Sequence, residues 1–212
     1  MQRLTEIAMF NAVGGVFSRA EVVCWVGGTP DSQFGLLKRA VAAGEVMVLR
    51  RGLYALADRY LRQKLHPFSV AQRIYGPSYI SLESALSFHG WIPEAVYATT
   101  SASAERSREL DTPLGRFGFD RIPQHILYTQ VERLDPFGSG AFLIAAPLKA
   151  LADYVYVHQL AWESAKPAIE SLRVDPPLLL GVDRAAIDLL RENYPSLRVQ
   201  RFLKGLGREL GK

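Results

Sequence analysis

The chain has 212 residues, of which 49% are hydrophobic and 22% are charged, a balance typical of folded globular proteins and not of disordered tails. This length accommodates two small domains, and the net charge of +4 is a weak indication of polyanionic partners. The single cysteine, Cys24, excludes an internal disulfide, and the apolar runs fit neither a bilayer span nor a signal peptide, so we expect a cytoplasmic protein that does not enter the membrane.

Three short helices are predicted before residue 45. The first covers Leu4 to Val13 and is ended by two glycines. The second covers Arg19 to Val26, and Ser18 and Glu21 before and within it have the spacing of a capping box. Cys24 lies in this apolar second helix and is expected to be buried. Helices this short are stable only when they pack together, so we expect them to share one small core.

The third helix, Asp31 to Ala43, separates its side chains onto two faces at 3.6 residues per turn. Pro30 suits its first turn, Thr29 or Asp31 can cap its free N–H groups, and Gly44 ends it. The inner face consists of Leu36, Leu37, Ala40 and Val41. The outer face consists of Ser32, Gly35, Lys38, Arg39 and Ala42. Small side chains let a helix approach the floor of a DNA groove, and two cations can reach phosphates or base edges.

Residues 45–56 form two β-prone runs around Arg50, Arg51 and Gly52, which predicts a hairpin with two arginines at its tip. Such a tip can grip a DNA backbone or enter the minor groove. Three helices followed by a hairpin predict a winged helix-turn-helix over residues 1–64. This region holds nine Lys and Arg against five Asp and Glu, so the whole net charge of +4 lies there. The alternative interpretation is a solvated helix face and an ordinary surface hairpin.

A second domain is predicted over residues 65–212, after a joint in which Pro67 interrupts any helix between Asp58 and Arg73. Its first helix begins after Ser81, a good N-cap, and stops at Gly90. Candidate strands follow at Val96–Thr100, Gly115–Arg121, Ile126–Tyr128, Val131–Leu134 and Ala141–Ala145. A helix over Pro147 to Gln159 comes next. The pattern indicates a mixed sheet flanked by helices, and the chain as a whole is predicted to be α+β.

Two further helices, Arg184 to Asn193 and Ser196 to Leu210, are predicted to finish the chain. In the last one an apolar face is formed by Val199, Phe202, Leu203, Leu206 and Leu210. The opposite face carries Arg198, Arg201, Lys204 and Arg208. Such a face is often only solvated, and the alternative is a docking surface for an acidic protein or for DNA. Gly205 and Gly207 lower the helix propensity here, so the sequence does not determine the residue at which this helix ends.

The residue types that catalysis requires are not grouped in this sequence. The four histidines have no paired metal-ligand spacing, and no Gly-rich phosphate-binding loop is present. Gly138 and Ser139 resemble the start of a nucleotidyltransferase motif, but Asp153 has no acidic neighbour two positions on to complete a magnesium site. We therefore expect no enzyme, no metal and no cofactor. A pocket joining Glu83, His89 and Asp153 would reopen the question.

Three segments in order resemble the AbiEi-type antitoxins, which belong to bacterial toxin-antitoxin systems of the abortive infection type. Residues 44–54 are similar to the wing of that family, and residues 79–90, with Ser81, Glu83 and Leu86, are similar to the motif that opens its second domain. Residues 146–153 are similar to the start of its later helix, although Leu148 stands where family members commonly carry Glu.

The resemblance implies a repressor that binds double-stranded DNA in its own promoter and a second domain that neutralises a nucleotidyltransferase-like toxin. The DNA-binding half of this expectation also follows from the residues themselves, whereas the antitoxin half follows from the resemblance alone. Two alternatives stay open. One is a stand-alone winged-helix regulator without a toxin, and the other is a protein-interaction module.

Overall fold

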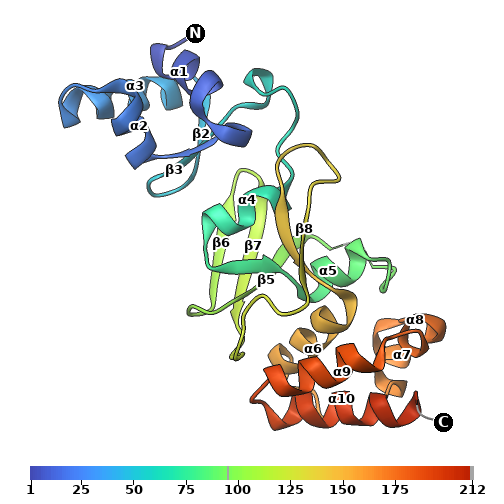
Figure 1. Ribbon diagram of the computed structural model, residues 1–212. Helices are drawn as coiled ribbons and strands as arrows, with labels where there is room; N and C mark the ends of the chain where they lie inside the picture. The colour runs from blue at the N-terminus through green and yellow to red at the C-terminus, as the bar shows by residue number, and fades with distance from the viewer. Residues whose placement is uncertain (95, 211–212) are drawn as a thin grey trace.

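The computed structural model describes residues 1–94 and 96–210, which form an α+β structure with two separate sheets (Figure 1). The smaller sheet has three strands in the order β1-β3-β2. The larger sheet has six strands in the order β6-β7-β5-β4-β9-β8 and is mixed, because β4 runs parallel to β9 and β5 runs parallel to β7. Figure 1 shows the smaller sheet and its helices at one end of the molecule and the C-terminal helices at the other.

The N-terminal unit, residues 1–64, contains three helices around the smaller sheet. Its elements are α1 (Arg3–Asn11), β1 (Val16–Ser18), α2 (Arg19–Val26), α3 (Pro30–Ala42), β2 (Val46–Arg50) and β3 (Leu53–Leu56), with 3-10 turns at Val13–Gly15 and Asp58–Tyr60. They enclose a core formed by Leu4, Ala8, Phe17, Val22, Leu37, Ala40, Val46 and Leu56. The predicted helices and hairpin are confirmed to within two residues, and the capping box of Ser18 and Glu21 is present.

One strand of this unit was missed, and one expectation was wrong. Strand β1 was not predicted, because three residues are too few to show a periodic pattern, yet Val16 pairs with Ala55 in the antiparallel register of β1 and β3. Cys24 is exposed and not buried, since it lies beside Val23 on the side of α2 that faces solvent, and the apolar run extends around the whole helix.

The C-terminal region, residues 65–210, begins with a helix where none was expected. Helix α4 covers Pro67–Ile74, and Pro67 stands at its first turn, where the missing N–H costs nothing. The expectation that Pro67 interrupts any helix was therefore wrong. His66 caps the helix, because its Nδ1 accepts a hydrogen bond from the backbone N–H of Phe68 at 3.2 Å.

The larger sheet contains β4 (Ser78–Ile80), β5 (Ala98–Ser103), β6 (Arg108–Thr112), β7 (Gly115–Arg121), β8 (Val131–Leu134) and β9 (Phe142–Ala145). Strands β7 and β8 have the predicted bounds, and β5 begins two residues later than predicted. Strand β6 was not predicted, because it is an edge strand of mostly exposed, charged residues.

The predicted strand Ile126–Tyr128 is instead a turn. The Asn193 side chain forms two hydrogen bonds with the backbone of Ile126. Asn193 Oδ1 accepts from the Ile126 N–H at 2.8 Å, and Asn193 Nδ2 donates to the Ile126 carbonyl at 3.0 Å. A side chain about 70 positions away therefore replaces a strand partner, and the local sequence carries no sign of it.

The helices of this region are α5 (Leu82–Phe88), α6 (Pro147–Val157), α7 (Lys166–Leu172), α8 (Pro176–Leu180), α9 (Arg184–Asn193) and α10 (Leu197–Glu209). Helix α9 has the predicted bounds, and the short helices α7 and α8 were missed. Ser81 stands at the N-cap of α5 without capping it, because its hydroxyl donates to Asp153 instead.

The hydrophobic core of the C-terminal region extends into the N-terminal unit. Val16, Leu49, Leu53 and Ala55 are all buried, and they pack in the same cluster as Val70, Ile74 and Tyr79 rather than in the small N-terminal core. One face of the smaller sheet therefore packs against α1 to α3, and residues from its strands also contribute to the larger core.

Two glycines of α10 offer a matched test of the packing at the C-terminus. A Cβ at Gly205 would lie 1.8 Å from the backbone oxygen of Glu163, whereas a Cβ at Gly207 would meet its nearest neighbour at an ordinary 3.6 Å. We expect Gly205→Ala to destabilise the protein by about 1 to 3 kcal/mol or more, as overpacking does. Gly207→Ala should be neutral or stabilising by up to about 1 kcal/mol, because alanine favours the helix. Urea unfolding measures both, and equal effects would contradict the close contact.

The His66 cap predicts a pH dependence of stability. Burial lowers the pKa of His66 below its usual value of 6.5, so the unfolded chain binds the proton more tightly than the folded one. Stability should therefore fall as the pH is lowered from about 7 to about 5. His66→Asn keeps an N-cap side chain without a titrating group, so it should flatten this slope. Thermal melting over this range checks it, and a slope that stays the same in His66→Asn would contradict the prediction.

Candidate nucleic-acid interface

Helix α3 presents the face that the sequence predicted. Ser32, Lys38 and Arg39 are exposed and Gly35 is half-buried, while Leu37 and Ala40 on the inner face are buried. Thr29 caps the helix by accepting a hydrogen bond from the Ser32 N–H at 3.3 Å, and Pro30 occupies its first turn. One face of α3 therefore packs in the small core, and Lys38 and Arg39 are exposed to solvent on the opposite face.

A hollow of about 400 Å³ lies along this outer face. Ser32, Gly35 and Arg39 line it together with Arg3 from α1 and the glycine turn before α3, and Asp31 is the one acid among the described residues of the lining. The Arg39 guanidinium lies back along the helix, since a Cβ at Gly35 would be 3.5 Å from Arg39 Nη1. Two arginines from different helices thus face one concave surface. Arg3 was not identified from the sequence, because only the folded structure brings α1 next to the start of α3.

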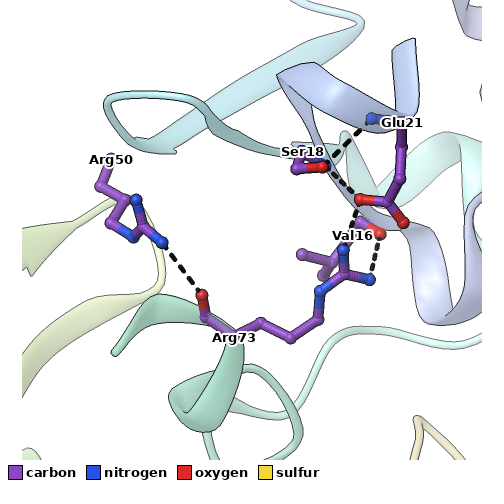
Figure 2. Close-up of polar contacts among 5 residues, drawn as sticks. All are labelled: Val16, Ser18, Glu21, Arg50 and Arg73. Carbon is purple, nitrogen blue, oxygen red and sulfur yellow. Dashed lines mark hydrogen bonds and ion pairs between the residues drawn. The ribbon is translucent and has the colours of Figure 1, made fainter. Parts of the chain in front are cut away.

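The two arginines of the hairpin have different surroundings. Arg51 is exposed at the turn after β2. Arg50 reaches the C-terminal end of α4 instead, where its Nε donates to the Ile74 carbonyl at 2.6 Å. Its Nη2 donates to the Arg73 carbonyl at 3.5 Å (Figure 2). These carbonyls lack partners within their helix, so a guanidinium satisfies and charge-compensates them. Both arginines are exposed, but the Arg50 guanidinium is bound to the end of α4, whereas Arg51 makes no side-chain hydrogen bond or ion pair with another described residue.

Arg73 makes the reciprocal contact from α4 to the N-terminal unit. Its Nη1 donates to the Val16 carbonyl at 2.8 Å, and its Nη2 lies 2.7 Å from Glu21 Oε2 (Figure 2). The same Glu21 oxygen accepts from the Ser18 N–H at 2.6 Å and so completes the capping box of α2. We name these contacts of Arg73 with Val16 and Glu21 the Arg73 clasp. It connects the start of α2 to the C-terminal region.

The basic face of α10 lies at the far end of the molecule from α3 (Figure 1). Arg201, Lys204 and Arg208 are exposed, whereas Arg198 is half-buried. Arg198 lines a hollow with Tyr156 on one side and a second one with Trp162 on the other. The two sets of cations predicted from the sequence are therefore on separate surfaces.

A buried polar cluster lies between the larger sheet, α6 and α9. Asp153 is fully buried and accepts hydrogen bonds from the hydroxyls of Tyr79, Ser81 and Tyr194, and Lys149 beside it donates to Gln124. Burial raises the pKa of Asp153 and lowers the pKa of Lys149, because it disfavours the charged form of each. Every group in this set has a partner within the protein, which is the pattern of a structural network.

The structure does not bring together the residues that would reopen an enzymatic interpretation. Glu83 pairs with His158 at 3.1 Å, and His89 contacts the Ala145 carbonyl at 3.0 Å, while Asp153 belongs to the buried cluster. Within residues 1–94 and 96–210, no three His, Cys, Asp or Glu side chains are grouped as metal ligands. No helix in the described part of the chain is long and apolar enough to cross a bilayer.

Comparison of the sequence with models of protein families and with curated proteins finds no match.

The Arg73 clasp predicts a pH-dependent contribution from Glu21. Burial acts to raise the pKa of Glu21, but the hydrogen bonds from Ser18 and the charge of Arg73 outweigh it, and the pKa is lowered below 4.5. The ionised group therefore stabilises the fold above about pH 4.5, and this contribution is lost as the pH falls through the lowered value.

Glu21→Gln should lower the stability at pH 7 by about 1 kcal/mol, since the pair is partly exposed. The difference from the unmodified protein should shrink as the pH falls through the lowered pKa of Glu21. Glu6→Gln, on the exposed face of α1, is the matched control. A pH-independent loss in Glu21→Gln would show that its charge is not what stabilises the junction.

Proposed function

We propose that this protein is a DNA-binding transcriptional regulator whose N-terminal unit is a winged helix-turn-helix. The observation that carries the proposal is the outer face of α3. There Ser32 and Arg39 line a concave surface to which Arg3 adds a further positive charge, and Lys38 is exposed on the same helix.

The physical argument concerns shape and charge together. Gly35 and Ser32 leave the α3 backbone close to the surface, so this helix can enter a major groove without steric hindrance from its own side chains. Lys38 and Arg39 then lie where base edges and phosphates would be. In this proposal Arg51 is the hairpin residue that contacts the backbone, because Arg50 is bound to the end of α4.

The finer functional proposal is an autoregulator and antitoxin of a toxin-antitoxin system. It rests on the similarity of residues 44–54, 79–90 and 146–153 to AbiEi-type antitoxins, and it assigns the protein to the cytoplasm, where its promoter and a nucleotidyltransferase-like toxin would be its partners. The exposed cations of α10, Arg201, Lys204 and Arg208, are the surface we propose for the toxin. A stand-alone regulator and a protein-interaction module are the alternatives.

Substitutions on α3 test the DNA-binding proposal. We expect Lys38→Ala and Arg39→Ala each to weaken binding to upstream DNA by about 1 to 3 kcal/mol if the side chain contacts a base. Arg51→Ala should weaken binding to all duplexes alike and reduce the salt slope by about 0.9. Fluorescence anisotropy with the region upstream of the gene measures both effects.

Lys204→Ala removes one charge at the opposite end of the molecule and is the matched control for these titrations. If Lys38→Ala, Arg39→Ala and Arg51→Ala all bound DNA like this control, the recognition role of α3 would be excluded. A salt-insensitive or absent affinity for duplex DNA, together with a stable protein complex, would favour the interaction module.

The antitoxin proposal has a separate test. If a nucleotidyltransferase-like toxin is encoded beside this gene, its expression should inhibit growth. Co-expression of this protein with the toxin should then restore growth. The triple substitution of Arg201, Lys204 and Arg208 by Ala should weaken their complex in a pull-down while leaving DNA binding unchanged. If this variant still restored growth and still formed the complex, α10 would not be the surface that contacts the toxin.

A further inference from the structure

We propose that the C-terminal region carries part of the DNA interface, in the form of an arginine strip made of Arg19 and Arg51 from the N-terminal unit and Arg106 and Arg108 from the C-terminal region. This inference rests on the proposed DNA-binding function and extends its footprint beyond α3 and the hairpin. The partner is the phosphate backbone of the same duplex.

The end of α4 brings the two halves of the strip together. Arg50 at the hairpin donates to the Ile74 carbonyl at 2.6 Å, which places the hairpin tip beside Tyr75. The Tyr75 hydroxyl donates to the Arg106 carbonyl at 3.0 Å, and the Arg108 guanidinium lies 5.1 Å from the centre of the Tyr75 ring. Strands β2 and β6 also contact each other directly. Arg106 and Arg108 therefore both contact Tyr75, and Arg51 follows directly on Arg50, which is bound to the carbonyl of the residue before Tyr75.

Arg19 joins the strip from the other side of the hairpin. Its backbone N–H donates to the Gly52 carbonyl at 3.0 Å, so the first residue of α2 lies against the turn that carries Arg51. The strip thus contains residues from α2, the hairpin turn, the loop before β6 and β6 itself, which are separated by up to about 90 positions in the sequence.

The charge of the strip is available to a ligand. All four arginines are exposed, and none of them forms an ion pair with another described residue. Glu21, the acid nearest to Arg19 in the sequence, is already neutralised by Arg73 in the clasp. Glu105 and Glu109 are exposed acids next to Arg106 and Arg108. Side chains alternate along a strand, so Glu109 lies on the face of β6 opposite to Arg108, and Glu105 is the acid that reduces the positive charge of the strip.

The chemistry of the strip favours a phosphate backbone over an acidic protein. Protein partners gain most of their affinity from apolar anchors at the centre of an interface. The exposed large apolar side chains described in the N-terminal unit are spread over several elements and form no centre within the strip: Met1, Met9, Phe10, Val13, Val23, Phe34 and Val48. Repeated guanidinium groups without an apolar centre match a chain of phosphates, and Arg binds phosphate through two parallel hydrogen bonds.

The test is a salt titration of the full chain with a random-sequence duplex of about three helical turns. Each phosphate contact that is lost should reduce the slope of log K against log salt by about 0.9, so Arg106→Gln with Arg108→Gln should reduce it by about 1.8. Arg106→Lys with Arg108→Lys keeps the charge and should keep the slope. Glu105→Gln should increase affinity severalfold at low salt.

The matched control is Arg133→Gln. Arg133 is an exposed arginine on β8, at the opposite edge of the same sheet, so removing it should leave the slope unchanged. Melting temperatures verify that the variants fold. If the double variant melts at a lower temperature, Arg106→Gln alone carries the test, with an expected loss of about 0.9 in the slope.

The outcomes separate this inference from the function on which it rests. If Lys38→Ala and Arg39→Ala weaken DNA binding but the Arg106 and Arg108 double variant behaves like Arg133→Gln, the strip is overturned and the regulator stands. If neither set changes DNA binding, both proposals fail. If the double variant loses a protein partner at an unchanged DNA slope, the strip serves an acidic protein and the inference is wrong.

Discussion

The placement of the N-terminal unit depends on the Arg73 clasp and on the contact of Arg50 with the end of α4. These two arginines cross the junction in opposite directions: Arg73 reaches β1 and the start of α2, and Arg50 reaches back to the carbonyls of Arg73 and Ile74. Both contacts are charge-assisted and partly shielded from water, which makes them stronger than ordinary surface pairs. Together with the shared apolar core they hold the smaller sheet against the larger one, and the arginine strip exists only because of that arrangement.

The three helices and the hairpin of the N-terminal unit could be predicted from the sequence because their signals are local. The capping box of Ser18 and Glu21, the Pro30 start of α3 and the turn at Gly52 each act within a few residues. The outer face of α3 followed from helical periodicity alone. The hydrogen-bond partners of Arg50 could not be predicted. They are two backbone carbonyl groups more than 20 positions away, and every residue has such a group, so the sequence does not distinguish these two.

Errors in the C-terminal region have two physical origins, one local and one distant. Pro67 permits a helix start as readily as it breaks a helix interior, and the neighbouring His66 caps the helix that starts there. The turn at Ile126 depends on Asn193, and the edge strand β6 is held by its ladder with β7 and not by apolar alternation. Arg3, Arg106 and Arg108 were missed as site candidates because each lies outside the predicted recognition elements and reaches its surface only through the fold.

The buried cluster around Asp153 determines which parts of the C-terminal region can exist separately. Its members come from β4, from α6 and from Tyr194 after α9, so a single carboxylate joins the sheet to the end of the chain. A fragment that stopped before Tyr194 would leave this carboxylate short of a donor in a place that water does not reach. The larger sheet and the C-terminal helices are therefore inseparable as a folding unit, and the basic face of α10 is carried on a rigid support rather than on a detachable tail.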